Sequence, residues 1–343
     1  MKKEVSFSIG NRFLPALLIT LFFILTGTST NAQDQWTDWH RPVDNPVFTV
    51  SHGNNHDAVL FVDTTLEYPY HLIVSGRGCT PDRGNNPEAA YLWRTKHFSW
   101  SSEDWELVSG HYEIGCHYEY DDGVKVGGKY YIFESGNVYT FDGPLEEAAG
   151  KWKKEGTFPS HLCDDVGVYY EDGVFHLFGE YGNFPHGPDG TSLSHLTSET
   201  GLGDWTLEDT LAVNPNPGGG NTYGVGDPTI EKIQGAYYIY CDIESPGSPY
   251  KVIAWKSESL DARFDYQGVA MPARLSETED WDNYRIQDAD IAYIPDLSRY
   301  VMVCNMMDRD GTPGGYFPTL DGFTRVVGFI YSDEKLDSFP KAR

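Results

Sequence analysis

The chain has 343 residues, of which 51 are acidic and 25 are basic, so its formal net charge is −26. A surface this acidic repels nucleic-acid phosphates and anionic membranes, which excludes both as expected partners. Five cysteines without a CxxC pair are too few for a disulfide scaffold and lack the spacing of a zinc site. The odd number leaves a free thiol. If one bridge forms, we expect it to join Cys116 and Cys163.

Residues 1–33 have the layout of a secretory signal peptide. Lys2 and Lys3 give a basic start, residues 14–25 are apolar, and small residues follow as a cleavage site. The apolar run is too short to predict a membrane span. We therefore expect a periplasmic or secreted protein whose mature part, residues 34–343, is a single domain with 22 basic and 50 acidic residues.

The mature part predicts an all-β fold with an internal repeat. Short β-branched and aromatic runs alternate with Gly, Pro, Asp and Asn clusters, and no long helical periodicity is present. Gly128, Gly173, Gly235 and Ser298 each stand two residues before a run rich in aromatic or β-branched residues. Residues 70–74 form the first copy, after a longer turn. Each copy therefore reads as a hairpin whose turn is followed by a buried strand.

Acidic residues stand in register with these turns. Asp165, Asp227 and Asp290 lie eight residues before the turn position of their copies. In the second copy Tyr120 stands eight residues before the turn, with Glu119 beside it, and Asp57 is the corresponding residue of the first copy. The positions 57, 120, 165, 227 and 290 are separated by 63, 45, 62 and 63 residues. Five units of four antiparallel strands are typical of a five-bladed β-propeller. A two-sheet sandwich, the main competitor, would not require such regular spacing.

Aromatic residues mark the outer strand of each predicted blade. Trp105, Trp152 and Trp205 begin three of these strands, and we expect them to lie in the core. The fifth unit lacks its own outer strand, whereas Asp38-Trp39 near the mature start matches the marker. Residues 36–50 are therefore predicted to complete the fifth blade and close the ring, which covers an otherwise open edge.

The propeller topology brings the strand-opening acids to one funnel, because every innermost strand begins on the same face. Carboxylates crowded in such a place differ in pKa, so that one can act as a base and another as an acid. The ends of the second strands reach the same face, and they add Glu180 and Glu244 as alternative acids. The residues expected to bind substrate around this funnel are His56, Arg77, His117, Glu119, Asp290 and Arg309.

Three short motifs, HDA at Asp57, CDD at Asp165 and GDP at Asp227, resemble those of the family-43 glycoside hydrolases and their five-bladed relatives in families 32, 62, 68 and 117. The resemblance implies inverting hydrolysis of a glycosidic bond in a plant or algal polysaccharide or oligosaccharide. It implies that Asp57 is the base, that Asp165 holds the pKa of the acid up, and that Asp227 is the acid. The family has Glu at the last position, so Glu180, Glu244 or a histidine remains an alternative acid.

Two other functional classes are compatible with the sequence. A non-catalytic glycan-binding propeller would explain the shorter acid at Asp227, and a polysaccharide lyase would use His and Tyr, for which His117-Tyr118 and Tyr181 are candidates. In each case the expected partner is a carbohydrate. No cofactor is required, and a structural Ca²⁺ on the propeller axis is compatible with the acidic funnel, with its ligands unassigned. The sequence does not predict an oligomeric state.

Overall fold

A computed structural model describes much of the predicted domain. The chain divides into two compact units, Met1–Asp34 and Gln35–Arg343, and every described residue belongs to the second. The described residues are 39–42, 55–76, 90–109, 120–182, 191–213, 224–244, 250–272, 285–307 and 325–332.

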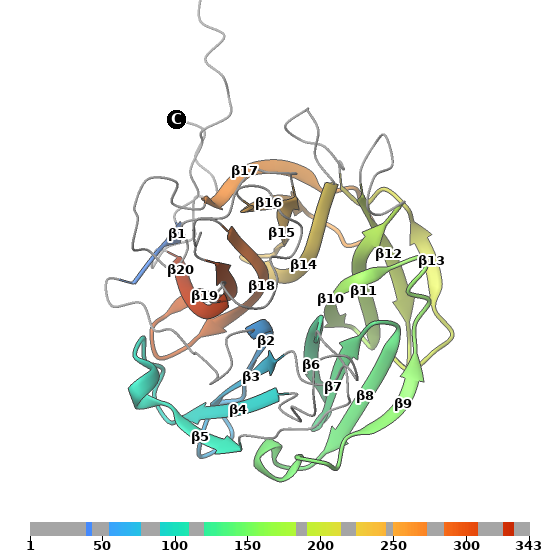
Figure 1. The fold of residues 1–343 in the computed structure, drawn as a ribbon. Helices are drawn as coiled ribbons and strands as arrows, with labels where there is room; N and C mark the ends of the chain where they lie inside the picture. Colours follow the sequence, from blue (N-terminus) through green and yellow to red (C-terminus); the bar gives the residue numbers. More distant parts are fainter. Residues whose placement is uncertain are drawn as a thin grey trace, which may run out of the picture. The chain divides into compact units, whose positions relative to one another are not determined.

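The described strands form five four-stranded antiparallel sheets, which Figure 1 shows arranged around one axis. The predicted five-bladed β-propeller is therefore confirmed. The innermost strands are β2 (Asn55–Val62), β6 (Asp122–Val126), β10 (Asp164–Glu171), β14 (Gly224–Ile233) and β18 (Arg285–Ile294). The second strands are β3 (Tyr70–Gly76), β7 (Lys129–Glu134), β11 (Val174–Tyr181), β15 (Ala236–Glu244) and β19 (Arg299–Met307).

The two outer strands of each blade follow in chain order, except in the fifth blade. The third strands are β4 (Ala90–Thr95), β8 (Asn137–Asp142), β12 (Ser192–Ser198), β16 (Lys251–Ser257) and β20 (Arg325–Ser332). The outermost strands are β5 (Glu106–Ser109), β9 (Lys153–Thr157), β13 (Thr206–Asp209), β17 (Asp265–Pro272) and, in the fifth blade, β1 (Trp39–His40).

The ring closes through β1, as the sequence predicts. Trp39 pairs with Ser332 and His40 with Tyr331, so the fifth blade combines strands from near both ends of the propeller unit. The Trp39 side chain is only 4% exposed, and its ring meets Tyr240 of the fourth blade edge-on at 5.5 Å. This short strand is therefore fixed by packing as well as by backbone pairing.

The hydrophobic core lies between neighbouring blades rather than at one centre. Five clusters each join two adjacent sheets; for example, Trp105 stacks on Phe329 with 6.0 Å between ring centroids, across the seam of blades one and five. The core prediction is therefore confirmed for Trp105, whereas Trp152 and Trp205 are partly buried and pack against two further clusters. Side chains of the inner strands that face the axis are therefore not required for this core and can be polar.

Buried polar groups also fasten the inner strands to one another around the axis. The Asp122 carboxylate of blade two accepts the Val168 N–H of blade three at 2.8 Å. The Asp290 carboxylate of blade five accepts the Leu60 N–H of blade one at 2.6 Å. Burial raises the pKa of Asp122 to about 7, and it raises the pKa of Asp290 well above its ordinary value. A layer of buried acids therefore lies within the ring.

Cys163, Cys241 and Cys304 are buried free thiols. The expected bridge from Cys163 to Cys116 is therefore wrong, while Cys116 itself lies outside the described residues. The Cys163 side chain is fully buried in the cluster between blades two and three, where a Cβ on Gly179 would stand 2.7 Å from its sulfur, and this packing holds the thiol inside the core. Among the described residues, no helix has the length and apolar character needed to cross a membrane.

Candidate active site

The innermost strands present aspartates at the axis through a repeated local distortion. The pairing of the innermost strand shifts by one residue near its start in blades one, three, four and five. At this bulge Asp165, Asp227 and Asp288 have positive φ angles of 39°, 46° and 49°. Aspartate tolerates this left-handed region better than most residues, and a bulge re-aims the side chain that it carries.

These aspartates line one pocket, here called the acidic pocket. Each of the five blades contributes one of its acids. The lining residues are Asp57, Asp121, Asp165, Val166, Asp227, Asp288 and Ala289. The residues to which the sequence assigned catalysis, Asp57, Asp165 and Asp227, are thus brought together.

Two blades contribute a different acid from the one expected. In blade two Asp121 lines the pocket, whereas Glu119 lies outside the described residues. In blade five Asp288 lines the pocket. Asp290 is instead buried, with 8% of its surface exposed, and accepts a hydrogen bond from the Leu60 N–H. The hairpin turn after β18 spans four residues, whereas the turn after β14 spans two. Counting eight residues back from Ser298 therefore reaches Asp290 instead of Asp288. Counting six residues back from the end of the strand reaches Asp288.

The other predicted site residues fall outside what the structure describes. His56 lies in β2 and Glu244 in β15, but their side chains are not among the described ones. The residues entirely outside the described ranges are Arg77, His117, Glu119 and Arg309. Their roles remain predictions.

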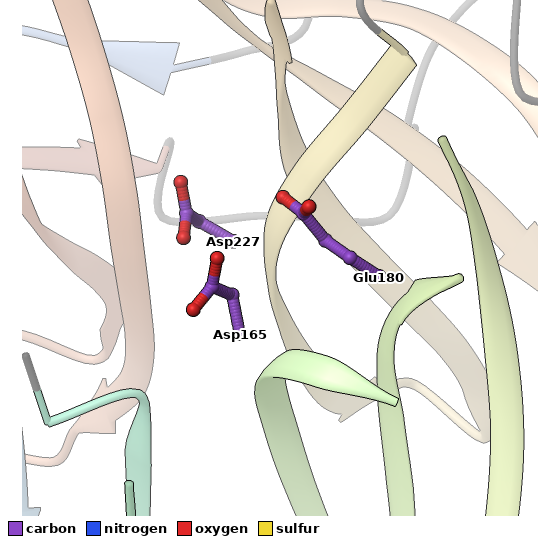
Figure 2. Close-up of side chains that lie close together, drawn as sticks. All are labelled: Asp165, Glu180 and Asp227. Carbon is purple, nitrogen blue, oxygen red and sulfur yellow. The ribbon is translucent and has the colours of Figure 1, made fainter. Parts of the chain in front are cut away.

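Glu180 approaches the pocket aspartates from the second strand of blade three. One carboxylate oxygen from each of Asp165, Glu180 and Asp227 lies within 4.8 Å of the others, and Figure 2 shows the three groups close together. Glu180 passes over Gly226, where an added Cβ would stand 2.2 Å from its Oε1 atom. The glycine before Asp227 is therefore what gives Glu180 room beside the blade-four acid.

The carboxyl of Asp227 holds a proton more strongly than an ordinary aspartate. Its pKa is raised well above the usual value, chiefly by burial and then by the negative charges of Asp288, Asp242 and Asp165, with a hydrogen bond to Asp288 adding to the effect. A carboxyl with this property near neutral pH can donate a proton. The pocket thus contains an acid among groups that can act as bases.

Asp288 is held by two amide groups. Gln287 Nε2 donates to its two oxygens at 2.9 and 3.0 Å, and Asn305 Nδ2 donates at 2.9 Å. Arg285 donates to Gln287 Oε1 at 3.5 Å, which orients the amide with its nitrogen towards Asp288. The Arg285 guanidinium in turn stacks on the Tyr250 ring at 3.9 Å. Gln287 and Asn305 are 7% and 1% exposed, so this arrangement is rigidly packed.

Converging carboxylates raise the question of a bound cation. Besides the group in Figure 2, one oxygen from each of Asp227, Asp242 and Asp288 lies within 4.8 Å of the others. Hard cations such as Ca²⁺ prefer oxygen ligands, so such groups are compatible with one. Asp227 belongs to both groups. The predicted structural Ca²⁺ stays a prediction, without assigned ligands.

Solved structures share this propeller fold. The catalytic domain of a GH62 α-L-arabinofuranosidase from Coprinopsis cinerea aligns with a TM-score of 0.55 at 10% sequence identity, over 82% of this chain and 92% of that one. An α-L-arabinofuranosidase from Podospora anserina, solved in complex with cellotriose, aligns at 0.56 and 10%, over 87% and 98%. A GH43_12 protein from a capybara gut metagenome aligns at 0.53 and 13%.

The chain covers 54% of the length of that gut metagenome protein, which aligns with 88% of the present chain. No family model and no curated protein matches the sequence. At identities this low, the likeness establishes the five-bladed fold alone. Any function must therefore be argued from the acidic pocket itself.

Proposed function

We propose that this protein is a glycoside hydrolase that inverts the anomeric configuration of its substrate. The observation that carries the proposal is the acidic pocket, where Asp227 keeps a raised pKa beside Asp57 and Asp165. An inverting glycosidase needs one protonated and one charged carboxyl, with room for a water between them. The shared fold with GH43 and GH62 structures adds support.

Each aspartate has a distinct role in the proposed reaction. Asp57 removes a proton from a water, which attacks the anomeric carbon as the glycosidic bond breaks. Asp227 donates its proton to the departing oxygen, and the negative charge of Asp165 helps to keep that proton in place beforehand. Glu180 is the alternative donor, because its carboxyl belongs to the same group of oxygens. Base and acid carboxyls are expected to lie roughly 6.5–9.5 Å apart.

We propose a plant or algal polysaccharide, or an oligosaccharide from one, as the substrate. The described pocket lining carries five aspartates and no cationic side chain, which suits a neutral sugar better than a uronate. The described lining also contains no His or Tyr, so a lyase has no support there. Export through the leader at residues 1–33 belongs to the same proposal, and N-terminal sequencing of the mature protein tests it.

Activity on arabinan, xylan and algal galactan tests the proposed hydrolysis. Asp57→Asn and Asp227→Asn should each lower kcat by roughly 10²–10⁴-fold, the usual range for general acid–base groups. Asp265→Asn, which removes an exposed charge on β17, is the matched control. Proton NMR of the first product formed should show the inverted anomer.

Two outcomes would contradict the proposal in different ways. Undiminished turnover by Asp57→Asn would remove Asp57 as the base. Saturable glycan binding without release of any sugar would instead favour a binding protein, in which Asp227 is too short to act as an acid. Retained configuration in the product would reject inversion while leaving hydrolysis intact.

A further inference from the structure

Two buried histidines face each other in the seam between blades three and four. His176 of β11 and His195 of β12 are 8% and 2% exposed, and His176 Nδ1 lies 3.0 Å from His195 Nε2. The His195 ring also stacks flat on Phe178, with 4.3 Å between centroids. Phe178 belongs to the apolar cluster that joins the two blades, and it meets Phe264 of blade four edge-on at 5.5 Å. The histidine pair is therefore part of the packing of this seam.

Blade one offers a direct comparison, because His71 stands at the same place in the repeat. His71 and His176 each follow an aromatic residue and precede a leucine in the second strand of their blade. The His71 ring is buried 3.0 Å from a carboxylate oxygen of Glu146, so a proton added there has a negative partner. A proton added to His176 meets a second imidazole instead, which becomes a repelling charge when it is protonated too.

The facing nitrogens of the pair suit a neutral state. When both rings are neutral, one donates its N–H to the bare nitrogen of the other. When both are protonated, both facing nitrogens carry hydrogens, so the bond is lost and two positive charges face each other in an apolar seam. Burial lowers the pKa of both rings, and the charge of His176 adds to this effect on His195, whose pKa falls to about 4.

The charged groups around the pair lie towards the edges of the seam. Those that act on one or both rings come from β10, β13 and blade four: Glu171, Glu208, Asp209 and Asp261. All but Glu171 are exposed, so water and salt screen them. Glu171 already accepts the Lys232 ammonium and the Tyr237 hydroxyl. Tyr169, opposite His176 in the ladder, stays neutral because burial raises its pKa. These groups therefore compensate a charge on the pair only weakly.

We propose that the His176–His195 pair is an acid-sensitive latch, whose double protonation opens the seam between blades three and four and thereby regulates the acidic pocket. His176, Phe178 and Glu180 alternate along β11, so they project from the same face of the sheet. Glu180 passes over Gly226 of blade four at the pocket end of this seam. Opening the seam withdraws Glu180 from the pocket. The consequence for catalysis rests on the proposed function, whereas the opening itself does not.

The direction of the pH effect follows from the lowered pKa values. Below about pH 6.5, the ordinary pKa of histidine, the open seam binds more protons than the closed one, so the seam loses stability as the pH falls through about 4. Each extra proton bound on opening raises the opening equilibrium about tenfold per pH unit. Asp122, which joins blades two and three, acts in the opposite sense because its pKa is raised. Acid therefore weakens one seam and not its neighbour.

Three buried thiols report on three seams separately. Cys241 lies in the cluster between blades three and four, Cys163 in that between two and three, and Cys304 in that between four and five. The protein is treated at pH 7 to 4 with dithiodipyridine, which reacts with thiols in mild acid as well as at neutral pH, and labelled cysteines are identified by mass spectrometry. Labelling of Cys241 relative to the other two should rise about tenfold or more between pH 6 and 4.5. Equal labelling of the three thiols at every pH would overturn the inference.

Variants assign the effect to the pair. His195→Phe keeps a ring on Phe178 and removes one titrating group, so the acid acceleration of Cys241 labelling should shrink about tenfold or more. If His195→Phe does not fold, His195→Gln removes the same group and retains an acceptor for His176. The matched control, His71→Phe, removes the buried histidine of blade one and should leave the acceleration as in the wild type. An unchanged acceleration in the folded His195 variant would contradict the latch.

Activity tests the link between the seam and the pocket. With any substrate that the glycan panel identifies, the acid limb of the kcat profile should lie at lower pH in His195→Phe than in the wild type and in His71→Phe. Coincident acid limbs in the three proteins would remove the regulatory role. Failure of the whole panel would count against the hydrolase and leave the labelling result standing, so the two proposals fail separately.

Discussion

Replacing Asp122 by Asn should change how the stability of the propeller depends on pH. Asp122 is 4% exposed and joins blades two and three through the Val168 N–H. Burial, followed by the negative charge of Glu231, raises its pKa from 3.8 to about 7 against the opposing effect of two backbone N–H donors. Val168 and Gly123 donate to different oxygens of Asp122, and asparagine retains one acceptor oxygen. Directed at the Val168 N–H, that oxygen keeps the bond across the seam, while the substitution removes the titration and the bond from the Gly123 N–H.

The sign and size of the effect follow from the raised pKa. Between pH 4 and 7 the folded state binds more protons at Asp122 than the unfolded state, so the free energy of unfolding falls as the pH rises through this window. At about 1.4 kcal/mol per pKa unit, the shift corresponds to about 4 kcal/mol, an upper limit because neighbouring Glu231, with a pKa of about 7, titrates in the same range. About 3 kcal/mol of this should be lost between pH 4.5 and 7.

Urea unfolding followed by tryptophan fluorescence at pH 4.5, 6 and 7.5 measures the effect. The wild type should lose stability over this range more steeply than Asp122→Asn, and the difference between the two should shrink or reverse as the pH rises. Asp142→Asn, at the exposed end of β8 in the same blade, controls for the change in net charge. Parallel stability curves for the wild type and Asp122→Asn would refute the reasoning.

Three further changes test other parts of the structure. Gly226→Ala should cost about 1–3 kcal/mol and displace Glu180, because the new Cβ would stand 2.2 Å from Oε1, whereas Gly203→Ala, with open space around it, should cost much less in thermal unfolding. Trp39→Ala should cost about 3–5 kcal/mol in urea unfolding if the buried β1 side chain closes the ring, and a neutral effect would deny it that role. Cys163, whose thiol pKa burial raises to about 12, should react with a thiol reagent only after unfolding, and labelling of the native protein would contradict this.

The repeat was readable from the sequence because each blade carries the same short signals. These signals are a turn glycine before an aromatic strand and a tryptophan at the outer strand. They follow from local rules of turns and packing, so they can be recognised without knowledge of the tertiary structure. The same rules placed Trp39 in the missing outer strand, which the pairing with Ser332 confirms. Local sequence patterns were therefore sufficient to predict the number of blades and the closure of the ring.

The composition of the pocket was only partly predictable, since it depends on features that vary from blade to blade. Asp288 was missed because the turn after β18 has four residues, so the eight-residue spacing that identified Asp227 does not apply in blade five. The anchoring of Asp288 by Asn305, and the passage of Glu180 over Gly226, join strands that no short motif relates. Such contacts arise from tertiary packing and have no signature in a single sequence.

The pairing of β1 with β20 has a consequence for how the chain reaches its folded state. Trp39 and Ser332 lie 293 positions apart, whereas a single blade spans roughly 60 residues. Closing the longer loop costs roughly 1.4 kcal/mol more in chain entropy, so the fifth blade should assemble after the others. Until then the outer edge of β20 is open, and in concentrated refolding mixtures the β1 strand of a second molecule can fill it. Exchanged dimers are thus the misassembly that this architecture invites.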